Sequence, residues 1–203
     1  MVATGGAVAS GVITVGVLSL QGDVEEHLDA LSTYRIPSRP VKTAEDLQSV
    51  DGLIIPGGES TTVGEMMHRF GLMVPFKKRV KDGMPVWGTC MGMIILAKKV
   101  VGSSQPTLGL LDIEVRRNAF GRQIESAEVP LSIDVLGSKP FPGVFIRAPW
   151  IESSWGDAKV LADLDGHGVM VRQGGLLGTS FHPELSSDGR VHRYFADMVA
   201  KKA

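Results

Sequence analysis

The chain contains a single cysteine, Cys90, in a setting suited to nucleophilic chemistry. It lies in the run Gly88-Thr89-Cys90-Met91-Gly92, between strand-like residues 85–88 and helix-like residues 91–101. Glycines two positions before and after it permit a tight strand-to-helix turn, because they remove Cβ clashes. The start of a helix also favours a thiolate over a thiol. The pattern predicts a nucleophile elbow, whereas an isolated cysteine is usually a small buried apolar residue.

A histidine and a glutamate near the C-terminus could complete this chemistry. His182 and Glu184 lie in Phe181-His182-Pro183-Glu184, directly after strand-like residues. In an extended chain the two side chains point the same way, and Pro183 opposes a helix there. A carboxylate beside an imidazole selects the tautomer that accepts a proton from a thiol, and it stabilises the imidazolium. We therefore predict a triad of Cys90 as nucleophile, His182 as base and Glu184 as the residue that orients the base.

A third segment, Pro56-Gly57-Gly58-Glu59-Ser60, follows the strand-like residues 52–55. Open α/β sheets bind ligands at the carboxyl ends of their strands. The backbone amides of Gly58 and Met91 could therefore hold an oxyanion. A phosphate-binding loop is the alternative, but the segment lacks the Gly-Lys-Ser/Thr ending and the Gly-x-Gly-x-x-Gly pattern of such loops.

The elements that must position these residues alternate in the first half of the chain. Strand-like runs lie at residues 12–18, 39–41, 52–55 and 85–88. Helix-like stretches at residues 23–34 and 61–70 and a short helix with a capping-box pattern at 43–46 lie between them, and a helix-like stretch at 91–101 follows the last strand-like run. This alternation is typical of βαβ units in a parallel sheet. Strand-like runs at residues 111–116, 129–135 and 143–147 then predict an antiparallel portion. The chain closes with strand-like runs at 168–171 and 176–181 and a helix at about 190–201. The predicted fold is α/β in three layers, with a mostly parallel central sheet flanked by helices.

Composition limits the class of protein. Hydrophobic residues make up 43% of the 203 residues and charged residues 21%, which is ordinary globular usage. We expect one domain over residues 12–203 after a disordered extension of residues 1–11. A formal net charge of -1, without a basic block or a membrane-length apolar run, argues against nucleic acid or membrane partners. One cysteine allows no intramolecular disulfide, so we expect a cytoplasmic location.

Metal binding has little support in the sequence. The His-x-Glu pair at residues 182–184 has no second cluster of ligands beside it, so a zinc ion would lack partners. His27, His68, His167 and His192 are scattered without the spacing of metal ligands. We therefore predict no metal site.

Several segments together resemble the class I glutamine amidotransferase family, and within it the glutaminase subunits of pyridoxal phosphate synthases. The elbow and the His-Pro-Glu segment are shared by many amidotransferases. The similarity to the pyridoxal phosphate branch covers nearly everything after residue 11 and rests on Leu20-Gln21-Gly22, Gly57-Gly58-Glu59-Ser60-Thr61-Thr62, Arg117-Asn118-Ala119-Phe120-Gly121-Arg122-Gln123 and Phe145-Ile146-Arg147-Ala148-Pro149.

This resemblance implies a flavodoxin-like fold and hydrolysis of L-glutamine to L-glutamate and ammonia, without a cofactor. It also implies a hetero-oligomeric complex in which ammonia passes through a tunnel to a (β/α)8-barrel pyridoxal 5'-phosphate synthase subunit. The family usually has alanine where this chain has Met91. By the same resemblance, the residues that surround bound glutamine are Gln21, Gly57, Gly58, Glu59, Arg117, Ile146 and Arg147.

Other functions stay open on the sequence. The chain could be the glutaminase subunit of another amidotransferase pathway, or a non-catalytic amidotransferase-like binding subunit. The three filled triad positions argue against the second of these. A hydrolase or chaperone-like protein of the related superfamily shares the elbow, but the His-Pro-Glu segment near the C-terminus disfavours it.

Overall fold

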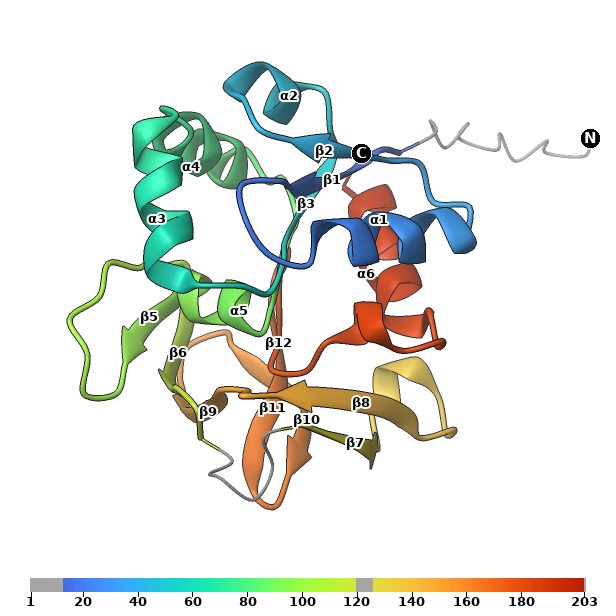
Figure 1. Cartoon of the computed structure of the whole chain (residues 1–203). Coiled ribbons are helices and arrows are strands. Elements are labelled where there is room, and N and C mark those ends of the chain that lie inside the picture. The colour runs from blue at the N-terminus through green and yellow to red at the C-terminus, as the bar shows by residue number, and fades with distance from the viewer. Residues whose placement is uncertain (1–12, 120–125, 203) are drawn as a thin grey trace, which may run out of the picture.

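Helices cover both faces of a central sheet in the computed structural model (Figure 1). It describes residues 13–119 and 126–202, so the predicted disordered extension lies outside the described residues. The main sheet has ten strands in the order β2-β1-β3-β4-β12-β11-β9-β6-β5, with β10 paired to β11. In the described part of the chain, no helix is long and apolar enough to cross a membrane.

The parallel half of the sheet contains β1, β2, β3, β4 and β12. Their bounds are Val15–Leu18, Ser38–Val41, Gly52–Ile55, Val86–Thr89 and Leu176–Thr179. Every residue of β1, β3 and β4 is buried, as expected for strands covered on both faces. The carboxyl ends of these strands therefore meet at one edge.

The second half of the sheet is mostly antiparallel. Strand β12 runs parallel to β4 and antiparallel to β11, so the sheet changes direction there. The predicted α/β fold with an antiparallel portion is confirmed. The remaining strands of the main sheet are β5 (Ala97–Val100), β6 (Leu111–Arg116), β9 (Trp150–Ser154), β10 (Lys159–Leu164) and β11 (His167–Gln173), and β7 (Ser126–Leu131) pairs with β8 (Phe141–Ile146) in a separate sheet.

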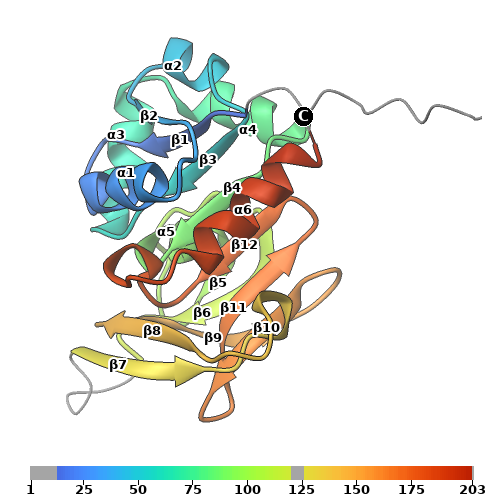
Figure 2. The same cartoon turned by 90° about the vertical axis from the view of Figure 1, so that its right-hand side faces the viewer.

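Two apolar clusters correspond to the two faces of the sheet. Alternate strand residues point to opposite faces, so Val86 belongs to one cluster and Trp87 to the other. The Val86 cluster includes residues of α3 (Ser60–Arg69), α4 (Met73–Lys81) and α5 (Met91–Leu96). The Trp87 cluster includes residues of α1 (Val24–Thr33) and α6 (Arg190–Ala200), which lie on the other side in Figures 1 and 2.

Helix α2 (Ala44–Gln48) begins with the capping box that the sequence predicts. The hydroxyl of Thr43 accepts the amide N–H of Asp46 at 3.1 Å, and the Asp46 carboxylate accepts the amide N–H of Thr43 at 3.0 Å. Two backbone donors of the first turn are thereby satisfied by side chains.

The predicted helix over residues 91–101 is wrong in its second half. Helix α5 ends at Leu96, and Ala97–Val100 form β5, which pairs with β6. The amides of Leu108 and Leu110 bond to the carbonyls of Ile95 and Leu96 at 2.7 and 2.9 Å. A distant segment thus satisfies the carbonyls at the helix end, and the chain is free to continue as a strand.

Other boundaries also differ from the prediction. The strand expected at residues 129–135 ends at Leu131, and the 3-10 helix η1 (Asp134–Leu136) follows it. Helix α4 and strands β9 and β10 were not predicted. Strands β9 and β10 are largely exposed along their length, so they lack the buried pattern by which a strand is recognised in a sequence.

Close packing at the start of α5 gives a stability prediction. A Cβ added to Gly92 would lie 2.1 Å from the carbonyl oxygen of Ile55 in β3, whereas one added to Gly64 in α3 would meet no atom of the described residues within 4 Å. We expect Gly92→Ala to lower the free energy of unfolding by at least about 2 kcal/mol through overpacking. Gly64→Ala should raise it by about 0.5–1 kcal/mol. Urea unfolding measures both, and equal effects would contradict this packing.

Candidate active site

Four loops converge at the carboxyl edge of the parallel strands. They follow β1, β3, β4 and β12, and they carry Asp23, Gly58, Cys90 and His182 to the wall of one cavity of about 390 Å³. The described residues that line this cavity are Gln21, Asp23, Gly58, Glu59, Cys90, Met91, Ile94, Arg117, Asn118, Ile146, Arg147, His182 and Leu185. The fold therefore brings most of the predicted site residues together.

The turn at Cys90 has the predicted elbow geometry. Cys90 has φ 47° and ψ -103°, a backbone conformation that is unfavourable for a residue with a side chain. A Cβ added to Gly88 would lie 2.3 Å from the carbonyl carbon of Gly92, so the two glycines allow the strand and helix to touch. The amide of Cys90 donates to the carbonyl of Thr179 in β12 at 2.7 Å, which holds the turn against the neighbouring strand.

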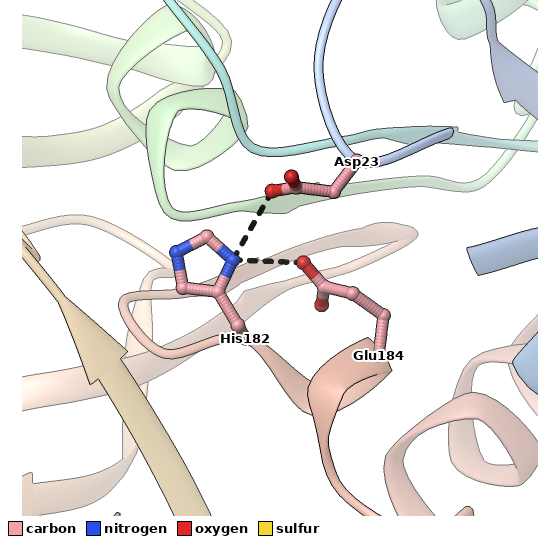
Figure 3. A group of neighbouring side chains, drawn as sticks. All are labelled: Asp23, His182 and Glu184. Atoms are coloured by element: carbon pink, nitrogen blue, oxygen red, sulfur yellow. Dashed lines mark hydrogen bonds and ion pairs between the residues drawn. The ribbon is translucent and has the colours of Figure 1, made fainter. Parts of the chain in front are cut away.

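His182 and Glu184 are in contact, but not through the extended geometry that the sequence predicts. His182 Nδ1 lies 2.8 Å from Glu184 Oε1, while Pro183–Leu185 form a 3-10 helix, η2. Pro183 takes the first position of this helix, where a missing amide N–H and a preset φ are tolerated. The turn brings the buried carboxylate next to the imidazole (Figure 3).

Asp23 is a second carboxylate beside His182, and no pattern in the sequence predicts its place there. Its Oδ2 lies 3.4 Å from His182 Nδ1 (Figure 3). An aspartate before a helix is ordinarily assigned to capping, yet the Asp23 side chain caps nothing in α1. Its amide instead donates to the carbonyl of Gly57 at 3.2 Å, which ties the loop after β1 to the loop after β3. No local signal distinguishes this role from a cap.

These contacts set the charge of the imidazole. Burial by itself would lower the pKa of His182, but hydrogen bonds with Asp23, Cys90 and Glu184 and the charge of Cys90 raise it to about 12. The stabilisation from charged His182 is therefore complete below its ordinary pKa of 6.5 and is lost only as the pH rises towards 12. Burial raises the pKa of Glu184, while the hydrogen bond and charge of His182 oppose this shift.

Asp23, His182 and Glu184 also have the composition of a metal site, since one ligand atom of each lies within 4.8 Å of the others. Both carboxylates, however, approach the same nitrogen, His182 Nδ1. The separation of 2.8 Å from Glu184 is that of an N–H···O hydrogen bond. Hydrogen bonding to a protonated imidazole accounts for this cluster.

The two residues predicted to hold the oxyanion, Gly58 and Met91, line the same cavity as Cys90. Met91 is the first residue of α5, so its amide has no acceptor within the helix. Gly58 has φ 151°, and a Cβ there would lie 2.7 Å from Gln21 Oε1. Gln21 Oε1 also accepts the amide N–H of Glu59 at 2.8 Å, so Gln21 supports the loop. Gly57 packs against His182 and is not in the cavity lining.

The predicted substrate-binding arginines, Arg117 and Arg147, form part of the cavity wall. Arg117 follows β6 and donates to Gln105 Oε1 at 2.7 Å, and Arg147 follows β8. Asn118 and Arg147 have φ of 46° and 43°, so two adjoining parts of this wall have strained backbone. Asn118 also lines the cavity, although the sequence predicts no site role for it within the run Arg117 to Gln123. Phe120-Gly121-Arg122-Gln123 of that run lie outside the described residues.

Two further histidines, His27 and His192, are fully buried, and His27 lies beside Glu184. Burial lowers the pKa of His192 to about 4, and burial together with the charges of His192 and His182 lowers the pKa of His27. Both rings are therefore neutral at pH 7. When folding lowers the pKa of a base, the base contributes stability at pH values above its ordinary pKa. That contribution is lost as the pH falls towards the pKa of the group in the folded protein.

We therefore expect stability to fall between pH 6.5 and pH 4, with a contribution from His192 of the order of 3 kcal/mol. His192→Gln removes the titrating group, so the variant should lose less stability over this interval than the wild type. Urea unfolding at pH 7 and pH 4.5 measures the difference. Parallel losses in the two proteins would contradict the prediction.

Known proteins match this chain along most of its length. "Pyridoxal 5'-phosphate synthase subunit PdxT" of Streptomyces coelicolor is 57% identical over 187 residues, which cover 91% of this chain and 93% of that protein. The protein of the same name from Moorella thermoacetica is 50% identical over 185 residues, covering 91% and 98%.

Solved structures agree with these matches. One described as a crystal structure of a glutamine amidotransferase has a TM-score of 0.86 and 48% identity, and it covers 93% of this chain and 99% of that chain. PurLQS from Thermotoga maritima has a TM-score of 0.66 at 18% identity, covering 91% and 97%, and shares the fold alone. The profile of the SNO glutamine amidotransferase family matches residues 17–201. The family predicted from the sequence is thereby confirmed, and the chain belongs to the SNO glutamine amidotransferase family.

Proposed function

We propose that this chain is the glutaminase subunit of a pyridoxal 5'-phosphate synthase. It hydrolyses L-glutamine and supplies the ammonia to a synthase subunit. The observation that carries the chemistry is the shared cavity of Cys90 and His182, with Glu184 bonded to the far nitrogen of the imidazole. The names of the relatives from Streptomyces coelicolor and Moorella thermoacetica support the pathway.

In the proposed mechanism, the Cys90 thiolate attacks the side-chain carboxamide carbon of glutamine. The amides of Gly58 and Met91 hold the oxyanion that forms. His182, as imidazolium, gives its Nε2 proton to the departing ammonia, and a γ-glutamyl thioester remains. The same imidazole then takes a proton from water, whose oxygen attacks the thioester and releases glutamate and the thiolate. Glu184 keeps the proton of His182 on Nδ1 throughout.

Positive charge on the cavity wall supports recognition of an amino acid. Arg117 and Arg147 are exposed side chains beside the cavity and suit the α-carboxylate of glutamine. Gln21, Gly57, Gly58, Glu59 and Ile146 complete the substrate site in this proposal.

The ammonia requires an acceptor outside this chain. We take the partner to be a (β/α)8-barrel synthase subunit in a hetero-oligomeric complex, in which ammonia travels through a tunnel. Pyridoxal 5'-phosphate is then the product of the complex and not a cofactor of this chain.

The nucleophile is tested with Cys90→Ala, assayed for ammonia release from glutamine in the presence of the synthase subunit. Loss of the thiolate should reduce kcat by at least about 10³-fold, because no covalent intermediate can form. Binding of glutamine, followed by calorimetry, should persist. Undiminished ammonia release would refute the role of Cys90.

The role of Arg117 in binding glutamine is tested by substituting two neighbouring arginines in turn. Arg117→Ala should raise KM for glutamine by about 10-fold or more, through loss of a charged hydrogen bond. Arg116→Ala is the matched control, because Arg116 pairs with Glu152 at 2.9 Å and is not in the cavity lining. Steady-state kinetics distinguish them. Equal effects of the two substitutions on KM would exclude a specific role for Arg117.

A further inference from the structure

A buried row of side chains extends from the triad into the core. His27 in α1 and His192 in α6 are both 0% exposed, and His27 Nδ1 lies 3.1 Å from His192 Nε2. On its other side, His27 Nε2 lies 3.4 Å from Glu184 Oε2. The row therefore runs from His192 through His27 and Glu184 to His182. The proposed mechanism gives no part to the first two members.

Strand β4 fixes the ring of His27. Trp87 meets the ring edge-on at a centroid distance of 5.5 Å, and it meets His192 in a similar arrangement at 5.0 Å. Thr89 Oγ1 lies 3.2 Å from His27 Nε2. Because Thr89 directly precedes Cys90, His27 contacts both the strand that carries the nucleophile and the residue that orients the base.

The neighbours of His27 determine where its proton lies. The ring is neutral, so it carries one N–H. Glu184 Oε2 is buried and has no hydrogen bond to any other group among the described residues. A proton on Nδ1 would leave the lone pair of Nε2 facing that oxygen. With the proton on Nε2, His27 donates towards Glu184 and Thr89, and its Nδ1 accepts from His192 Nε2.

We propose that His27 is a positioning residue whose Nε2–H holds the carboxylate of Glu184 against Nδ1 of His182. The inference rests on the proposed function, since it assigns a purpose to the orientation of Glu184. Asp23 and His27 are four residues apart at the start of α1, so one helical turn contacts both the base and the residue that orients it. Without the Nε2–H, a buried carboxylate oxygen has no donor, and the carboxyl group turns or takes up a proton.

The substitutions His27→Gln and His27→Asn separate this role from packing. The side-chain amide nitrogen of glutamine matches the position of Nε2, whereas that of asparagine matches Nδ1. Assayed with the synthase subunit, His27→Asn should lose about 10- to 100-fold in kcat, the usual effect of removing a partner that orients a site residue. His27→Gln should keep most of the activity. KM for glutamine should be unchanged in both, because His27 does not line the cavity. His68→Asn, at an exposed histidine of α3, is the control.

Equal kcat in the Gln and Asn variants, with an active wild type, would overturn the proposal and leave the proposed function standing. A fall in kcat of the Asn variant that is accompanied by a matching fall in its Tm would also overturn the proposal. The wild-type protein gives a second test that does not depend on activity or on the folding of a variant. Long-range ¹H–¹⁵N spectra of the histidine rings should show His27 protonated at Nε2, and a proton at Nδ1 would refute the proposal.

Discussion

Contact between the turn at Cys90 and strand β3 is the constraint on which the rest of the site depends. Gly92 lies so close to the carbonyl of Ile55 that no side chain fits between them. This contact places the first amide of α5 beside the loop that follows β3. The bond from the Cys90 amide to Thr179 then aligns the end of β12, from which His182 follows. Cys90, the amides of Gly58 and Met91, and His182 are thus positioned by backbone contacts between adjacent parallel strands, and each loop needs to extend only a few residues beyond the sheet.

The two halves of the sheet contribute different parts of the cavity. The parallel half supplies Cys90, His182 and the Gly58 loop, which carry out the proposed chemistry. The other wall comes from the ends of β6 and β8, where Arg117 and Arg147 follow. Strained backbone at Arg147 and Asn118 indicates that the surrounding structure holds this wall in position. A substrate between the walls would therefore contact segments that are remote from each other in the sequence.

Charge explains why so many polar groups are buried behind the cavity. A protonated His182 in a mostly buried position is costly unless acceptors surround it. Glu184 and Asp23 supply two, and Glu184 in turn needs donors for both of its oxygens. His182 forms a hydrogen bond with Oε1 of Glu184, and His27 lies beside Oε2. The role proposed for His27 thus follows from the charge on His182.

The sequence by itself determined the family, the α/β fold, the elbow and the capping box at Thr43, because each depends on residue types within a short segment or on a long match. The same local patterns singled out Cys90, His182 and Glu184. Tertiary structure alone decided where α5 ends, that Pro183–Leu185 turn into a 3-10 helix, and that Asp23 faces His182. The end of α5 and the places of Asp23 and His27 depend on contacts between residues 95 and 108, 23 and 182, and 27 and 192, whose separation along the chain leaves no periodic or local signal.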